Sequence, residues 1–146
     1  MKKGDEITAW KVVGKRNREC SNVILFFNPT KTWGSSKIKT AKKYINENPK
    51  LFPVYTKGIK LKALVESEGL FVFRTREWAR KFRRDYKITK FSKIIKVKGI
   101  VKYVQPKVTS GCGDHLYRVG SKIKFTWNHP VFPNSVITLS ELEVLT

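Results

Sequence analysis

Residues 69–86, GLFVFRTREWARKFRRDY, place arginine side chains between aromatic ones within a single short segment. Five of the chain's arginines lie between residues 74 and 84, whereas the rest of the chain relies mainly on lysine. The planar guanidinium group of arginine makes paired hydrogen bonds to phosphate and also stacks on nucleic-acid bases. These residue types at this spacing therefore point to the binding of phosphate groups.

Positive charge is concentrated around this segment. The 146-residue chain has 31 Lys and Arg against 11 Asp and Glu, which gives a net charge of +20. Residues 74–107 contain thirteen of these cations and only two acids, and residues 31–62 contain nine lysines and one acid. Such clustering favours a polyanionic partner, and nucleic acid is the partner that we expect. The cations expected at the interface are Arg74, Arg76, Arg80, Arg83, Arg84, Lys87, Lys96, Lys98 and Lys102.

Cysteine and histidine provide two other candidate sites. Cys20, Cys112, His115 and His129 could together bind a metal, but only Cys112-x-x-His115 has a usable spacing and no second paired motif accompanies it. Cys112 with either histidine, oriented by Asp114, could form a nucleophilic pair, although residues of one short turn rarely hold the required geometry. The chain also has no phosphate-binding loop, dinucleotide fingerprint or zinc-protease motif. We therefore expect a binding protein without metal or cofactor.

A helix over residues 75–86 would carry the arginines. Thr75 is a suitable N-cap, and Glu77 lies in the first turn, where the helix dipole favours an acid. The residues predicted to form the apolar stripe are Trp78, Ala79, Phe82 and Tyr86. The arginines predicted on the opposite face are Arg76, Arg80, Arg83 and Arg84.

Strand patterns dominate the rest of the chain. The strands expected are 7–13 and 21–27, paired as a hairpin, then 69–73, 91–105, one or two arms within 116–127, and 134–139. A second helix is a candidate over residues 40–48. Apolar residues make up 40% of the chain, which is enough for one core in one domain spanning residues 1–146. The predicted fold class is α+β, a mostly antiparallel sheet or half-barrel packed against helix.

Residues 91–105 alternate most clearly between apolar and basic side chains. Lys96, Lys98 and Lys102 share one face of this predicted strand, and Gly99 invites a bulge or a close approach of another backbone. If that face and the arginine face of the helix point the same way, they form one basic surface. For Trp10, which lies in the first strand, a place in the core is favoured over base stacking, and the same holds for Trp33 and Trp127.

The order of several short segments resembles small accessory proteins of tailed phages and bacteria. The matching segments are AWKVV, SNVILFF, YTKG, GLFVFRTREWARKF, IIKVKG and VFPNSVITLSELEVL, which together cover most of the chain. This resemblance implies a viral or accessory origin, and it supplies no active site.

A second resemblance concerns GLFVFRTREWARKF, which is similar to the strand-to-helix element of the ADP-ribosyltransferase fold. The residues that match this element are Gly69, Phe71, Phe73, Ala79 and Phe82. Glu141-x-Glu143 resembles the acidic end of that family's catalytic pattern. The chain departs from the family at AWKVV, where Lys11 stands in place of a His or Arg, and it lacks a mid-chain Ser-Thr-Ser motif. The resemblance implies an alternative, an NAD-dependent enzyme with a pocket between the first strand and residues 69–86.

The leading hypothesis remains a binding module that contacts nucleic acid, DNA or RNA, through its phosphates. A third hypothesis is a viral inhibitor that covers an acidic surface of a host protein. The first twenty residues turn charged at once, and no run of apolar residues approaches a membrane span. We therefore expect no membrane partner and a cytoplasmic location. For a viral protein this would be the host cytosol, whereas for a eukaryotic protein we expect the nucleus instead.

Overall fold

The computed structural model describes residues 1–14, 47, 53–85, 87–90, 92–105, 110–112, 115–117 and 136–146. The elements with described bounds are β1 (Glu6–Gly14), β2 (Lys60–Lys62), β3 (Gly69–Phe73), α2 (Arg76–Asp85), β4 (Ser92–Tyr103), β5 (Ser110–Cys112), β6 (His115–Tyr117) and β7 (Val136–Val144). Strands therefore predominate in the described part of the chain, as the alternating apolar pattern predicts.

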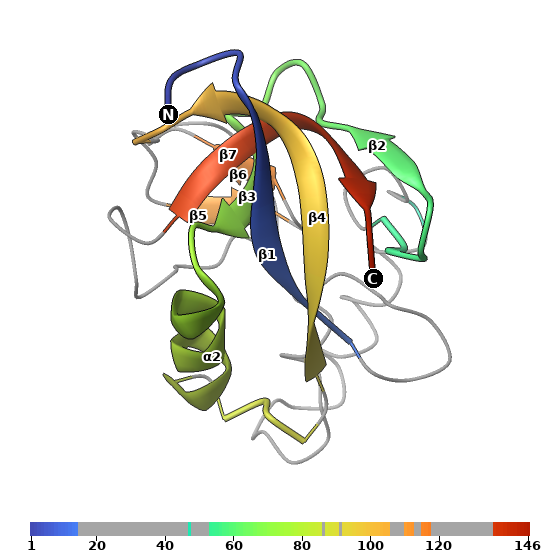
Figure 1. Cartoon of the computed structure of the whole chain (residues 1–146), viewed down its shortest axis with the longest axis vertical. Helices are drawn as coiled ribbons and strands as arrows, with labels where there is room; N and C mark the ends of the chain where they lie inside the picture. The colour runs from blue at the N-terminus through green and yellow to red at the C-terminus, as the bar shows by residue number, and fades with distance from the viewer. Residues whose placement is uncertain are drawn as a thin grey trace.

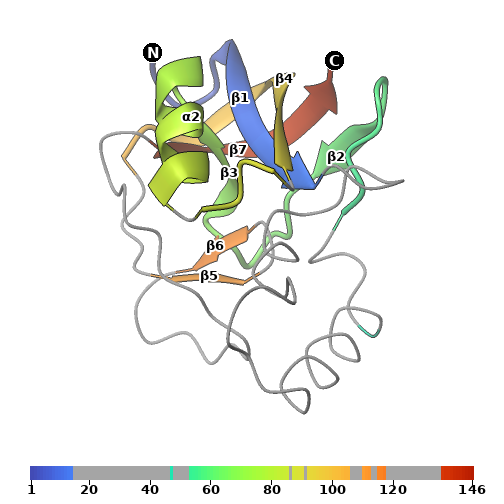
Figure 2. The same ribbon diagram turned by 90° about the horizontal axis from the view of Figure 1, so that it is seen from below.

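The strands form one antiparallel sheet that closes on itself (Figure 1). β1 pairs with both β4 and β3, and β7 also pairs with both β4 and β3, so these four strands make a small barrel. β2 extends the sheet from β7, while β6 and β5 extend it from β3 (Figure 2). The α+β class and the antiparallel sheet packed with one helix are confirmed.

The interior of the barrel is filled by the apolar side of each strand. In β1, Ala9 and Val13 are fully buried, and in β4 the alternate residues Ile95, Val97 and Val101 join them. Twelve of the buried apolar residues form one cluster, which comprises Ala9, Val13, Tyr55, Leu70, Val72, Ile95, Val97, Val101, Ile137, Leu139, Leu142 and Val144. The period of two that predicted strand 91–105 thus also identified its core face.

Gly99 pairs with Leu142 where β4 runs beside β7. A Cβ at this position would overlap the Glu141 carbonyl oxygen and lie 2.8 Å from Leu139 Cδ1. The register between β4 and β7 shifts just beyond, between Ile100 and Val101. The predicted bulge or close approach at Gly99 is confirmed, and its cause is crowding against the neighbouring strand β7.

Lys11 is an exception among the core positions of β1, because its side chain is fully buried. Its ammonium donates a hydrogen bond of 2.8 Å to the Phe71 carbonyl and lies 4.0 Å from the centre of the Phe71 ring. The Tyr55 ring lies 5.3 Å away. A carbonyl and two aromatic faces thus partly compensate for the loss of hydration of this cation.

Both ends of α2 are set by local hydrogen bonds. The Trp78 amide donates to Thr75 Oγ1 at 3.2 Å, which confirms Thr75 as the N-cap. At the other end, the Ile88 amide donates to the Arg83 carbonyl and the Lys87 amide to the Arg84 carbonyl, each at 3.0 Å. Lys87 has a positive φ of 56°, so these bonds form a Schellman ending with lysine at the position where glycine is usual.

The helix packs on the outside of the barrel beside β1 (Figures 1 and 2). Ala79 and Phe82 are fully buried, and the Phe82 ring lies 5.2 Å from that of Phe73. Trp78 is half-buried, and the side chain of Tyr86 lies outside the described residues. Burial of two members of the predicted apolar stripe gives the helix the tertiary support that a ten-residue segment needs.

Several predicted elements fall wholly or partly outside the described residues. Residues 21–27, the predicted hairpin partner of the first strand, lie outside the described residues. Of the candidate helix over residues 40–48, the structure describes only Glu47, which is helical. Within 116–127 only residues 116 and 117 are described, in β6. The last strand extends beyond the predicted residues 134–139, because β7 continues through SELEV to Val144.

Candidate nucleic-acid interface

The structure divides the nine predicted interface cations into three groups. The cations tied to main-chain carbonyl groups are Arg74, Arg83 and Lys102. Lys98 lies among carboxylates of the sheet. The cations on the exposed surface of α2, the turn after it and β4 are Arg76, Arg80, Arg84, Lys87 and Lys96. We call these last five the basic face.

Arg83 connects the end of α2 to the start of β4. Its Nε donates to Ser92 Oγ at 2.9 Å, and its Nη2 donates to the carbonyls of Thr89 and Ser92 at 2.8 and 2.7 Å. Burial, and then the nearby Arg80 charge, lower the pKa of the Arg83 guanidinium from the usual arginine value. The structure thus differs from the predicted outward face, because the loop between α2 and β4 uses this arginine to satisfy its carbonyls.

Arg74 and Lys102 also donate to carbonyls of other segments. Arg74 Nη2 lies 2.7 Å from the Val104 carbonyl oxygen, and Lys102 Nζ lies 2.7 Å from that of Ser67. Both side chains are half-buried. Each therefore joins a segment next to β3 to the end of β4, which limits its freedom to reach a ligand.

Arg76, Arg80 and Arg84 follow one another at intervals of four residues, so they form an exposed row on one face of α2. Arg80 Nη1 contacts Glu77 Oε1 at 2.7 Å, with the two side chains 49% and 75% exposed. Such an exposed ion pair contributes only about 0–1 kcal/mol, so a phosphate group can replace the carboxylate. In the part of the chain that the structure describes, Arg76 and Arg84 have no acid within ion-pair distance.

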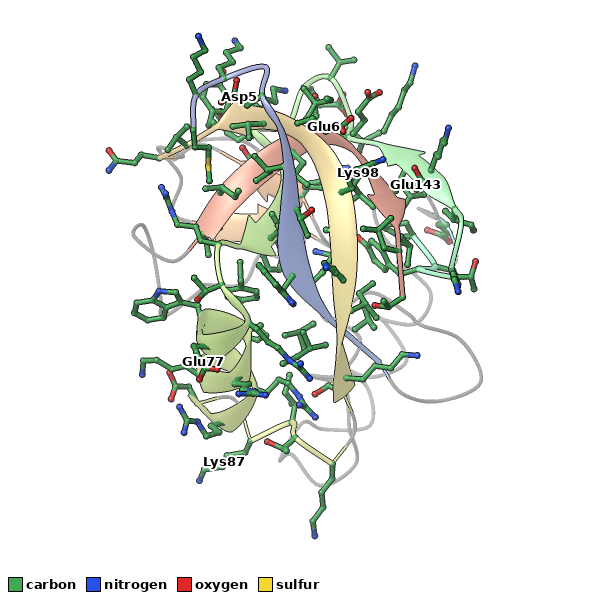
Figure 3. The ribbon with its side chains drawn as sticks, viewed as in Figure 1. Asp5, Glu6, Glu77, Lys87, Lys98 and Glu143 are labelled. Carbon is green, nitrogen blue, oxygen red and sulfur yellow. The ribbon has the colours of Figure 1, made fainter. Side chains whose placement is uncertain are left out.

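Lys87 and Lys96 extend the row of arginines in two directions. Lys87 is exposed at the end of α2 (Figure 3). Lys96 is exposed on β4, and its backbone amide donates a hydrogen bond of 2.9 Å to Thr146 Oγ1. The Leu145 amide donates to the Lys96 carbonyl, also at 2.9 Å. These bonds hold the backbone of Lys96 while its ammonium remains in solvent.

A depression of about 370 Å³ lies at the start of the arginine row. Trp10 of β1 and Lys96 of β4 are direct cross-strand partners within it, and Ile94, Arg76 and Thr146 complete its lining. Its lining residues thus come from β1, β4, α2 and the residue that follows β7 by two positions, and Figure 1 shows β1 and β4 side by side between α2 and the end of β7. The described lining contains two basic side chains and no acidic one. The helix and the strand thus meet in one basic surface here.

Trp10 lines this depression, whereas its sequence context favoured a place in the core. The structure leaves it half-buried on the outer side of β1, while its neighbours Ala9 and Lys11 are fully buried. Alternation along β1 separates Trp10 from Ala9 and Val13, but Val12 on the face of Trp10 is also fully buried, so the strand pattern alone does not show that Trp10 is accessible.

A second depression, of about 570 Å³, has a different electrostatic character. The direct register places Glu143 between Lys60 and Lys98, and Glu141 opposite Lys62. The charged residues that line this depression are Glu6, Lys60, Lys62, Lys98, Glu141 and Glu143. Figure 3 shows Glu6, Lys98 and Glu143 on this part of the sheet. Three carboxylates balance three ammonium groups, so this surface offers little net attraction to a polyanion.

The glutamates of the ADP-ribosyltransferase resemblance thus lie in an open, lysine-lined depression over β2, β7 and β4. The pocket that this resemblance implied was expected elsewhere, between the first strand and residues 69–86. There, β1 and β3 are hydrogen-bonded neighbours with Trp10 opposite Phe73. The Phe73 ring lies 5.2 Å from that of Phe82 on the helix, and the depression that Trp10 and Arg76 line at this place includes neither Glu141 nor Glu143.

The cysteine and histidine candidates are only partly described. Cys112 and His115 are direct partners in the β5–β6 hairpin, and His115 is buried. Cys20, Asp114 and His129 lie outside the described residues. Among the residues that the structure does describe, no three His, Cys, Asp or Glu side chains gather as metal ligands would. In that same part of the chain, no helix has the length and apolar character needed to cross a membrane.

Comparisons of the chain with protein-family models, with curated proteins and with solved structures find no match.

Proposed function

We propose that this protein binds nucleic acid through phosphate contacts, largely independently of base sequence. The observation that supports this most directly is the basic face, which gathers five exposed cations on α2, the following turn and β4. The chain as a whole carries a net charge of +20, so a long-range field reinforces these local contacts.

The spacing of the arginine row suits an extended polyanion. Arg76 and Arg84 are eight residues apart on α2, which at 1.5 Å per residue separates them by about 12 Å along the helix. Phosphates of one duplex strand follow each other at about 3.4 Å along the helix axis, so the row spans several of them. Arg80, midway, can exchange Glu77 for a phosphate.

Phosphate contacts position a protein on nucleic acid but do not distinguish sequences. The sequence contains no helix-turn-helix, zinc-finger or ribonucleoprotein motif that would place side chains on base edges. Weak sequence preference is therefore part of the proposal, together with a cytoplasmic accessory role of the kind that the phage-protein resemblance suggests.

The test is a binding titration with a labelled DNA duplex at several salt concentrations. If all five cations of the basic face neutralise phosphates, the double-logarithmic slope of affinity against salt is about −4 to −5. Absence of binding at low salt, or an affinity that salt leaves unchanged, would overturn the proposal. An acidic host protein captured from nuclease-treated lysate, without any oligonucleotide binding, would favour the inhibitor hypothesis instead.

A matched pair of double variants locates the interface. Arg76→Gln with Arg84→Gln should weaken binding roughly 10-fold or more and make the salt slope less steep by about 2. Lys2→Gln with Lys57→Gln removes the same charge from exposed residues outside the basic face and should change affinity less than about 2-fold. Equal losses in the two double variants would show that net charge alone, and not this face, determines binding.

A further inference from the structure

Trp10 has an unusual environment for a large aromatic side chain in a barrel strand. Its cross-strand partner on β3, Phe73, is fully buried, whereas Trp10 itself is only half-buried. Its partner on β4 is Lys96, whose side chain is exposed. Indole surface therefore remains accessible in the depression, directly beside a cation.

The depression has the size and lining of a site for a flat, anionic ligand. Its volume of about 370 Å³ lies at the lower end of the range of about 300–1,000 Å³ typical of small-molecule sites. Trp10 and Ile94 supply apolar surface, while Arg76 and Lys96 supply positive charge. A nucleotide combines a flat aromatic ring with a phosphate and so complements both kinds of surface.

We infer that this depression accommodates one unpaired base of a single-stranded nucleic acid, stacked against Trp10, with the adjoining phosphates on Arg76 and Lys96. The inference rests on the proposed function and specifies the substrate class: single strands over duplexes. A base within a duplex has both faces covered by its neighbours, so only an unpaired base can present a face to the indole. Stacking on an aromatic ring tolerates every base, which agrees with binding that does not depend on sequence.

Three probes of equal length test the inference: a single-stranded oligothymidylate, an abasic single strand with the same phosphates, and a duplex. The oligothymidylate should bind roughly 5-fold to 150-fold more tightly than the abasic strand, which corresponds to the usual energy of stacking one base on an aromatic side chain. Trp10→Ala should remove this difference and leave the affinity for the abasic strand within about 2-fold of the original. Trp10→Phe should retain most of the difference.

Two further variants keep the result interpretable. Trp10→Leu retains apolar volume without an aromatic face, and it should lose the preference for bases even if Trp10→Ala proves too unstable to study. Trp78→Ala removes a half-buried tryptophan of α2 outside the depression, and it should preserve the preference.

The outcomes separate this inference from the proposed function. Equal affinity of the original protein for the oligothymidylate and the abasic strand would overturn the base subsite while leaving phosphate binding intact. A preference that survives in Trp10→Leu would also overturn it. Failure of all three probes to bind at low salt would overturn both the proposed function and the subsite.

Discussion

Arg83 and Ser92 are joined side chain to side chain, because the Arg83 Nε donates a hydrogen bond of 2.9 Å to the Ser92 hydroxyl oxygen. Ser92 in turn donates to the Ile88 carbonyl at 2.7 Å, so the loop between α2 and β4 closes around its own polar groups. One arginine of the basic helix thereby holds the helix and the following strand together, and its neighbours remain available for a ligand.

Arg83→Ala is expected to lower the free energy of unfolding by about 1–3 kcal/mol, since three hydrogen bonds from a charged donor are lost and two carbonyls lose a partner. Arg84→Ala, an exposed position on the same turn, should change it by less than about 0.5 kcal/mol. Urea unfolding followed by circular dichroism measures both. Equal stabilities of the two variants would contradict the positioning role of Arg83.

Lys87→Gly is expected to raise the free energy of unfolding by about 0.5–1 kcal/mol, because glycine adopts the positive φ at the end of α2 without a Cβ clash. Lys87→Ala removes the same charge but keeps the strain, so its stability should stay close to the original. Both should weaken nucleic-acid binding to the same extent. Thermal unfolding and titration together check this, and equal stabilisation by alanine and glycine would refute it.

Gly99→Ala is expected to lower the free energy of unfolding by about 1–3 kcal/mol or more, because the added methyl group meets the Glu141 carbonyl and Leu139 on the neighbouring strand. Gly4→Ala makes a useful control, since its Cβ would meet no atom within 4 Å and only its positive φ of 90° adds strain. Chemical unfolding compares the two variants. A larger loss at Gly4 than at Gly99 would show that crowding does not dominate.

Lys11→Met is expected to destabilise the protein less than Lys11→Ala. Methionine retains most of the buried volume and loses the 2.8 Å hydrogen bond to Phe71, whereas alanine also leaves a cavity that costs about 2–4 kcal/mol. The measurement is again the free energy of unfolding in urea. If methionine were as harmful as alanine, the ammonium and not the aliphatic stem would be the main contribution of Lys11.

Local sequence signals predicted the helix and the strand alternation well. The Thr75 cap and the period of Ala79 and Phe82 are properties of neighbouring residues, so they are legible before any tertiary contact is known. The same holds for Ile95, Val97 and Val101, which a period of two assigns to one buried face. The crowded glycine at residue 99 was recognisable because glycine within a strand marks a bulge or a close approach.

Which group each cation contacts, in contrast, is decided by the tertiary structure. Composition and clustering established that the chain is strongly basic around residues 74–107. Only the folded chain brings Ser92 to Arg83, the Ser67 carbonyl to Lys102, and Glu143 beside Lys98. It also leaves Trp10 half-buried beside Lys96 and Arg76. These relationships join residues on different elements, and the strand register and helix docking that create them are set by packing of the whole barrel, which no local pattern contains.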